Sequence, residues 1–200
     1  PTPIVAAAGR VDDVSCCQNQ GLKGSGSKLI LLGGLHDRIG GSEYARQISN
    51  EPAGEPPVPD FKNETRIIKT ILNAYEKRIV LAAHDISHGG VLVTLAEMML
   101  GSAPFDKGCR IDITSEMAPG NSPERYLFSE FGGIVVEIDP KDWPEFETIL
   151  ETYQTPWQPL GDTTDERVLA VKWPGGQADW PLEDIDTAFR NGGKFNPLFA

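Results

Sequence analysis

The chain has 200 residues, of which 40% are hydrophobic, enough for one large domain with a buried core. Its 29 acidic and 18 basic residues give a formal net charge of -11, which argues against non-specific binding to nucleic acid or to anionic membranes. No stretch has the length of a membrane span, and the first residues do not resemble a signal peptide. We therefore expect a cytoplasmic protein.

The three cysteines, Cys16, Cys17 and Cys109, are too few and odd in number for a disulfide framework, which favours a reducing compartment. Cys16 and Cys17 are adjacent and lack the spacing of metal ligands, so we interpret all three as free thiols. The first residue is Pro1 rather than Met. We expect the sequence to start inside a longer protein.

The first part of the chain alternates apolar runs with breaks. Residues 4–8 predict a strand paired with a sheet, and residues 28–33 predict a strand that is buried on both faces. Between them, residues 18–27 are rich in glycine and serine and predict a loop or a domain boundary. Four prolines in residues 50–60 exclude a helix or a central strand there. Residues 63–78 predict an amphipathic helix. Its apolar face is expected to hold Ile67, Ile68, Ile71, Leu72 and Tyr75.

A glycine-bracketed turn follows the strand at residues 28–33. Ser42 is a good N-cap for the helix that comes next. Strand, glycine-rich turn and helix is a geometry that can cradle a phosphate, here at Gly40, Gly41 and Ser42. The Gly-Lys-Ser/Thr sequence of a P-loop is missing, and an ordinary tight turn explains these residues equally well.

Residues 81–101 are the most informative stretch. Their apolar start predicts a strand, two glycines break it, and helical spacing follows from Val91 onward. We expect the polar residues between strand and helix to lie in a turn at the helix N-terminus, where free N–H groups and the positive end of the dipole favour an anion. Glycine there lets a phosphate approach the backbone closely. The alternative, which the pattern alone favours, is that Asp85 or Ser87 simply caps the helix. The residues of this turn are His84, Asp85, Ser87, His88, Gly89 and Gly90.

The second half of the chain again mixes strands and helices. Strands are predicted at residues 109–113, 134–138, 158–162 and 168–172, and helices at residues 122–130, 140–153 and 181–190. Residues 191–200 are expected to be irregular. The alternation lacks the regular spacing of a doubly wound sheet. We predict an α/β (α+β) fold, a mixed β-sheet covered by helices on one face.

Three motifs, in this order, resemble phosphoribosylformylglycinamidine synthase, and more narrowly the synthetase subunit that uses ammonia from a separate glutaminase. They are residues 39–44 (IGGSEY), residues 83–90 (AHDISHGG) and residues 127–130 (LFSE). The resemblance covers nearly the whole chain and implies the last of four domains that form two pseudo-repeats, the C-terminal domain of the aminoimidazole ribonucleotide synthetase-like fold. It assigns residues 1–25 to the end of the preceding sheet-forming domain and residues 26–200 to the C-terminal α/β domain.

The resemblance implies an ATP-dependent ligase of de novo purine biosynthesis. In this family ATP phosphorylates the amide oxygen of formylglycinamide ribonucleotide, ammonia attacks, phosphate leaves, and Mg²⁺ is required. The implied partners are these substrates, the glutaminase subunit that supplies ammonia, and the remaining domains of the same polypeptide. The family's catalytic histidine and most of its nucleotide and magnesium ligands belong to those other domains. The catalytic residues are therefore unknown here, and the isolated chain is expected to be inactive.

The resemblance also implies a site. It puts His84, Asp85, Ser87, Gly89 and Gly90 in a cleft against the preceding domain, with the backbone toward phosphate. Asp85 or Glu130 could touch Mg²⁺ or a bound water. Each residue has a plainer explanation: His84 can hydrogen-bond a carbonyl, Asp85 can cap a helix, and Glu130 can close its own short helix. His36 and His88 are expected to be exposed turn residues.

The chain departs from the family pattern at two places, one in the second motif and one directly after the third. His88 stands where Asp is more usual. Phe131, Gly132 and Ile134 replace the usual Ser, Gln and Arg, which removes a candidate phosphate contact.

Two other hypotheses stay open. One is another ATP-dependent enzyme of the superfamily, namely aminoimidazole ribonucleotide synthetase, selenophosphate synthetase or a hydrogenase-maturation protein. The His-Asp-x-Ser and LFSE motifs favour the synthase over these relatives. The other is a purely structural module that buries a nucleotide, or nothing, and serves subunit assembly.

Overall fold

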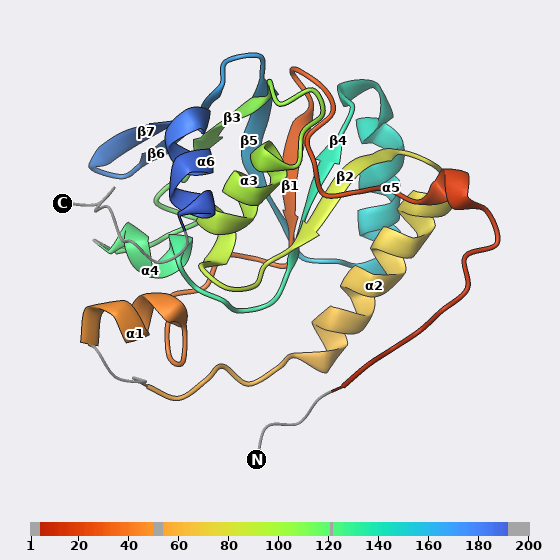
Figure 1. The fold of residues 1–200 in the computed structure, drawn as a ribbon. Helices are drawn as coiled ribbons and strands as arrows, with labels where there is room; N and C mark the ends of the chain where they lie inside the picture. Colours follow the sequence, from red (N-terminus) through yellow and green to blue (C-terminus); the bar gives the residue numbers. More distant parts are fainter. Residues whose placement is uncertain (1–4, 50–53, 121, 192–200) are drawn as a thin grey trace.

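The computed structural model describes residues 5–49, 54–120 and 122–191, arranged around a seven-stranded sheet of order β2-β4-β1-β5-β3-β6-β7 (Figure 1). Within these residues β3 and β6 pair in parallel and the other neighbouring strands pair antiparallel, which confirms the mixed α+β sheet. The strands are β1 (Lys28–Leu32), β2 (Val80–Asp85), β3 (Gly108–Asp112), β4 (Ile134–Ile138), β5 (Trp157–Thr164), β6 (Val168–Trp173) and β7 (Gly176–Pro181).

Helices cover both faces of the sheet, so the prediction that they cover one face is wrong. Leu29 and Leu31 of β1 pack into a core with α3 and α6, whereas Ile30 and Leu32 pack into a second core with α2 and α5. The cause is the apolar side chain at every position of β1 from Leu29 on, since alternate residues of a strand point to opposite faces. The helices are α1 (Glu43–Ser49), α2 (Phe61–Glu76), α3 (Gly90–Leu100), α4 (Pro123–Leu127), α5 (Trp143–Tyr153) and α6 (Leu182–Arg190), with single 3₁₀ turns at η1 (Val14–Cys16) and η2 (Pro140–Asp142).

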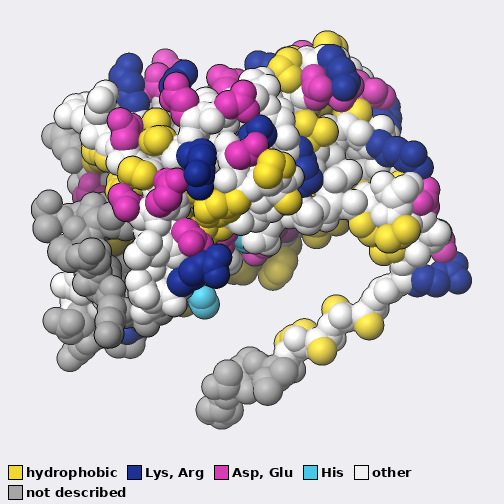
Figure 2. Space-filling view, turned by 45° about the horizontal axis from the view of Figure 1, so that its top comes forward, with side chains coloured by type: hydrophobic (Ala, Val, Ile, Leu, Met, Phe, Trp, Pro, Cys, Tyr) yellow, Lys and Arg dark blue, Asp and Glu magenta, His cyan; other side chains and the backbone are white. Residues whose placement is uncertain are grey.

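The N-terminal strand predicted at residues 4–8 is not formed. Ile4 lies outside the described residues, and residues 5–8 are exposed and irregular. Figure 2 shows this arm projecting away from the body of the domain, with hydrophobic side chains along it. The chain first contacts the body through the exposed ion pair of Asp13 with Arg78 at 2.9 Å, and it enters the core at Leu22, which is buried and donates its N–H to Met98 O at 3.0 Å. Residues 5–8 have no neighbouring strand among the described residues, so their apolar pattern has nothing to pair with.

Two further predictions need correction. In α2, Ile67 and Ile71 are buried as predicted, but Ile68 and Leu72 are more than half exposed. The buried stripe of this helix runs instead through Ile67, Thr70, Ile71 and Ala74. The edge strand β7 was not predicted, because it begins right after a glycine turn and buries Trp180 alone among its side chains. The free-thiol prediction holds for all three cysteines, and burial raises the pKa of Cys109 to about 12.

The passage from β2 to α3 differs in detail from the predicted turn. His84 and Asp85 are the last two residues of β2, not turn residues. Helix α3 starts at Gly90, after Gly89, and both glycines have positive φ, 84° and 69°. No side chain caps this helix, so the prediction of a cap from Asp85 or Ser87 is wrong. At the other motif, Ser42 caps α1 as predicted, because its Oγ accepts the Ala45 N–H at 3.1 Å.

Glu137 anchors the glycine-rich loop that leads into β1. Its side chain is fully buried in the middle of β4. One carboxylate oxygen accepts the Gly24 N–H at 2.7 Å and the other accepts the Lys23 N–H at 2.9 Å. A buried carboxylate is tolerated when hydrogen bonds satisfy it, and here it satisfies two loop amides in return.

Replacing Glu137 should therefore destabilise the fold. We expect Glu137→Ala to lower the free energy of unfolding by about 2–4 kcal/mol, because it removes two part-buried hydrogen bonds to a charged group, each worth roughly 1.5–3 kcal/mol, while it also removes the cost of burying the carboxylate. Glu145→Ala is the matched control, because Glu145 forms only a half-exposed ion pair with Lys77, and its loss should cost less than about 1 kcal/mol. Urea denaturation of both variants measures the difference. Equal midpoints for Glu137→Ala and wild type would contradict the anchoring role.

Gly89 should resist any side chain. A Cβ there would lie 2.3 Å from Val93 Cγ2, on a backbone with φ of 84°. Gly89→Val should lower the free energy of unfolding by roughly 3–5 kcal/mol, from left-handed strain plus overpacking. Gly26→Val isolates the strain, because Gly26 has φ of 76° with nothing within 4 Å of its Cβ position. Thermal melting should rank wild type above Gly26→Val and Gly26→Val above Gly89→Val. An unchanged melting temperature for Gly89→Val would contradict the tight turn at Gly89.

Candidate functional site

The carboxylate of Glu130 joins the two glycine motifs. Its Oε1 accepts the Gly89 N–H at 2.8 Å and the Glu43 N–H at 2.9 Å. The first donor precedes α3 and the second begins α1, so one oxygen meets the N-terminal ends of two helices from distant parts of the chain. Glu130 therefore holds the two turns together rather than closing its own short helix.

The segment after α4 approaches the start of α3 very closely. A Cβ on Gly90 would lie 2.6 Å from Leu127 O and 2.7 Å from Phe128 Cα, so only glycine fits at this position. The same segment also holds the loop before the first motif: Ser129 Oγ donates to Arg38 O at 2.8 Å. The residues of the LFSE motif thus contact both other motif regions, which the sequence order did not reveal.

The residues of the first motif have local structural roles. Gly40 lies against the proline-rich segment, because a Cβ there would sit 2.1 Å from Glu55 O. Gly41 has φ of 76°, and Ser42 is buried, donates its hydroxyl to Ile39 O at 2.6 Å and caps α1. Gly40 also lines an open hollow of about 580 Å³ whose wall includes Arg38 and Arg125. Two guanidinium groups beside a glycine turn can attract an anion.

His84 lies between two carboxylates. Its Nε2 is 3.1 Å from Glu97 Oε2 and its Nδ1 is 3.3 Å from Asp85 Oδ1, and its side chain is only 11% exposed. The partners are side-chain carboxylates, not the backbone carbonyl expected from the sequence. Glu97 was missed, although a carboxylate on the otherwise apolar helix α3 is a signal that could have marked it. Asp85 by contrast is 73% exposed and available to a ligand.

His84 and Asp85 line an open hollow of about 590 Å³ at the edge strand β2. The opposite wall is the stretch of chain just before the body of the domain, with three amide side chains in a row: Gln18, Asn19 and Gln20. Amide and carboxylate groups together suit a ligand rich in hydroxyl or metal-bound phosphate oxygens. Gly89 and Gly90 do not line this hollow, so the predicted site divides into a strand-edge part and a Glu130-centred part.

Two side chains from the loop after β1 contact the ring of Phe131. The Arg38 guanidinium lies 5.3 Å from the centroid of the Phe131 ring, and His36 contacts the same ring edge-on at 4.5 Å. His36 is therefore half-buried rather than exposed as expected. Burial lowers the pKa of His36, and the positive charge of Arg38 lowers it further, while the negative charge of Asp37 acts in the opposite direction. This imidazole is therefore neutral at pH 7. These side chains border a hollow of about 450 Å³ at the end of β1.

The two expected magnesium ligands, Asp85 and Glu130, differ in how well they suit a metal ion. No group of three or more His, Cys, Asp or Glu side chains that could hold a metal ion occurs in the described part of the chain. Mg²⁺ at nucleotide sites commonly uses one or two protein carboxylates together with phosphate oxygens and water. The exposed carboxylate of Asp85 fits that role. The Oε1 of Glu130 does not, because two N–H donors already point at it.

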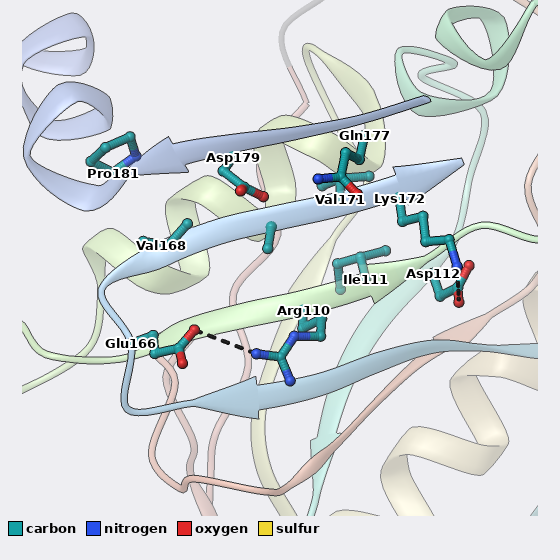
Figure 3. A pocket seen from close by; sticks show the side chains of 11 residues that line it. Arg110, Ile111, Asp112, Glu166, Val168, Val171, Lys172, Gln177, Asp179 and Pro181 are labelled. Carbon is teal, nitrogen blue, oxygen red and sulfur yellow. Dashed lines mark hydrogen bonds and ion pairs between the residues drawn. The ribbon is translucent and has the colours of Figure 1, made fainter. Parts of the chain in front are cut away.

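A further hollow of about 570 Å³ lies on the open face of β3, β6 and β7 and holds none of the predicted site residues (Figure 3). Arg110 and Glu166 form an exposed pair at 3.4 Å, and Lys172 lies 3.9 Å from Asp112. Exposed pairs of this kind are typical of a solvated sheet face. No described helix is both long and apolar enough to cross a membrane.

The chain is similar to known proteins over most of its length. A relative named phosphoribosylformylglycinamidine synthase subunit PurL, from Methanothrix thermoacetophila, is 40% identical over 153 residues, 76% of this chain and 19% of the relative. The protein of the same name from Symbiobacterium thermophilum is 32% identical over 202 residues, 95% of this chain and 26% of the relative. The chain thus spans about a fifth to a quarter of these relatives.

Solved structures share the fold at low sequence identity. Thermotoga maritima PurL complexed with FGAR matches with a TM-score of 0.70 at 18% identity, over 86% of this chain and 30% of that chain. The same protein complexed with ATP matches with a TM-score of 0.65, also at 18% identity, over 86% and 27% of the two chains. The hydrogenase maturation protein HypE of E. coli matches with a TM-score of 0.50 at 16% identity, over 82% and 52%.

The family model described as AIR synthase related protein, C-terminal domain, matches residues 24–174. This range runs from the loop anchored by Glu137 to the turn after β6, and it contains all three motifs. The chain therefore belongs to the AIR synthase related protein family, as a C-terminal domain of that family.

Proposed function

We propose that this chain is the C-terminal domain of an ATP-dependent phosphoribosylformylglycinamidine synthase of purine biosynthesis and contributes to a nucleotide- and phosphate-binding cleft. The similarity to proteins named phosphoribosylformylglycinamidine synthase subunit PurL supports this, as does the shared fold with Thermotoga maritima PurL, whose structures were solved in complex with ATP and with FGAR, the formylglycinamide ribonucleotide. In the proposal, residues 1–25 end the preceding domain and residues 26–200 form this one. Ammonia would come from a glutaminase subunit, and the enzyme would work in the cytoplasm.

The observation that carries the proposal is the position of the hollow beside β2. One wall is formed by His84 and Asp85 of the second motif. The other wall is formed by residues 18–21, which belong to the segment assigned to the preceding domain. A cleft between the two domains would therefore open at the edge of β2, with both residues facing it. Ser87 and Gly89 would continue that wall toward α3, and Gly40 and Gly41 would do so toward α1, with the buried Gly90 and Ser42 behind them.

The proposed ligand is ATP with Mg²⁺, which when bound would neutralise phosphate charge and orient the phosphoryl group. Asp85 would hold the ion through its exposed carboxylate. His84, positioned between Glu97 and Asp85, would fix the orientation of that carboxylate. Arg38 and Arg125 line the hollow beside Gly40 and would attract phosphate oxygens.

A structural module is the second candidate, and a specific observation favours it. The amides of Gly89 and Glu43, which the phosphate hypothesis needs, are satisfied by the protein's own Glu130. A domain whose glycine turns serve its own packing could bury a nucleotide without turnover, or bind none. Another ATP-dependent enzyme of the superfamily is supported only by the shared fold with HypE.

The test of the proposed function needs the complete polypeptide that contains this chain. With ATP, Mg²⁺, ammonia and formylglycinamide ribonucleotide, we expect substrate-dependent release of phosphate and formation of the amidine. The chain alone should release none, because the family's catalytic residues belong to other domains. Absence of turnover in the complete protein, with the substrates of the other superfamily members giving turnover, would refute the proposal. Nucleotide binding without any turnover would favour the structural module.

Asp85→Asn separates a metal ligand from a residue that only supports the fold. Asp85 caps no helix and is largely exposed, so Asn should change the melting temperature little. As a ligand for a hard cation, however, the neutral amide is a poor substitute, and the Mg²⁺ concentration needed for half-maximal nucleotide binding should rise about tenfold. Asp112→Asn is the control, an equally exposed carboxylate on the far side of the sheet. Equal Mg²⁺ dependence in Asp85→Asn and wild type would remove Asp85 from the site.

A further inference from the structure

Glu130 was expected to touch magnesium, but its contacts indicate another role. We propose that Glu130 is a positioning residue whose carboxylate fills the one anion position shared by the two glycine motifs, so that neither Mg²⁺ nor a phosphate group uses that position. The statement about magnesium and phosphate rests on the proposed function, whereas the statement about the carboxylate does not. It would hold equally for a domain that binds no nucleotide.

A single anionic oxygen satisfies both backbone amides at this position. The Gly89 and Glu43 N–H groups reach the same atom, Glu130 Oε1, at 2.8 and 2.9 Å. Gly89 stands at the N-terminus of the 11-residue helix α3, where the helix dipole and unpaired amides favour a negative charge. No side chain caps α3 from within its own turn. A carboxylate from a third segment therefore supplies the charge that a cap would otherwise supply.

The same geometry disfavours a metal ion at this oxygen. Mg²⁺ binds oxygen ligands at about 2.0–2.1 Å in near-ideal octahedral geometry. Two N–H groups with partial positive charge already converge on Oε1, and a cation there would face both. Turning Oε1 toward a metal would leave these amides without their acceptor, so the exclusion applies to this oxygen of the carboxylate. A phosphate oxygen meets the opposite difficulty, since it could bind these amides only after Glu130 had left.

The short segment that carries Glu130 also holds the other two motifs in place. Gly90 lies in backbone contact with Leu127 and Phe128, and Ser129 holds the carbonyl of Arg38. The two turns and the loop at Arg38 are therefore fixed to one short segment, residues 127–130. Any movement of this segment shifts the start of α1 and of α3 together. This coupling explains why three motifs far apart in the sequence form one unit in the structure.

The test follows the amides of Gly89 and Glu43 by NMR in the chain alone, without nucleotide or activity. In Glu130→Gln, which keeps an acceptor oxygen but loses the charge, exchange of both amides with solvent should accelerate together by about tenfold. The Leu22 amide, which bonds Met98 O on the far end of α3, should keep its wild-type rate. Glu116→Ala, at an exposed position outside this segment, is the control variant and should leave all three amides unchanged.

A second experiment replaces the missing carboxylate of Glu130 with a free anion and so tests the anion position directly. Glu130→Ala should melt at a lower temperature than wild type, and sodium acetate at constant ionic strength should raise that temperature saturably while shifting both amides. The wild type should show neither response to acetate or to inorganic phosphate, and Mg²⁺ should shift neither amide. If Glu130→Ala fails to fold, the Glu130→Gln exchange rates and the wild-type titrations still decide.

Three results would overturn the proposal. One is a saturable shift of the wild-type Gly89 and Glu43 amides with phosphate, which would show that the position is open. Another is a Mg²⁺-dependent shift of these amides that Glu130→Gln abolishes, which would make Glu130 a metal ligand. The third is wild-type exchange at both amides in Glu130→Gln. Failure of the proposed enzyme function would change none of these readouts, because they involve no nucleotide.

Discussion

The rest of the structure depends on one constraint, the burial of β1 on both faces. A strand with an apolar side chain at each position from Leu29 to Leu32 must be covered from two sides, and the two cores on either side of it are the result. α3 and α6 supply one cover, α2 and α5 the other (Figure 1). With both faces closed, ligands can reach this part of the sheet only at strand ends and at the edge. The hollows beside β2 and at the end of β1 lie in those places.

The order of elements could be read from the sequence because local patterns specify it. Apolar runs at β1 and β4 and the helical spacing of α3 are strong signals, and Ser42 marked its helix start correctly. What the sequence could not provide is the arrangement in three dimensions. Helices on a second face follow from the burial of β1, but no local pattern in α2 says which face it covers. Residues 5–8 show the reverse case, an apolar pattern without a neighbouring strand in the described chain.

The candidate site was predictable in its residues and not in its contacts. The sequence put His84, Asp85 and Gly89 in one turn, whereas the structure separates the strand-end residues from the glycines. The partners that decide their chemistry come from elsewhere in the chain: Glu97 is 13 residues beyond His84, and Glu130 is 41 residues beyond Gly89. Long-range hydrogen bonds of this kind leave no periodic signal. Only the resemblance, which links motifs without explaining them, grouped LFSE with the glycine turns.

These contacts change what the motifs can be taken to mean. A glycine-rich turn at a helix start is chemically able to bind phosphate, yet Gly90 is also required by close backbone packing and Gly89 by its positive φ. The fold alone therefore demands the glycines, whether or not a nucleotide binds. Asp85 is different, because it caps nothing and its carboxylate stays exposed at the rim of a polar hollow. Among the described residues, no stabilising side-chain contact other than the one with His84 explains an aspartate at this position. Of the two carboxylates expected at the metal, Asp85 rather than Glu130 is therefore the one on which a functional role for this domain must rest.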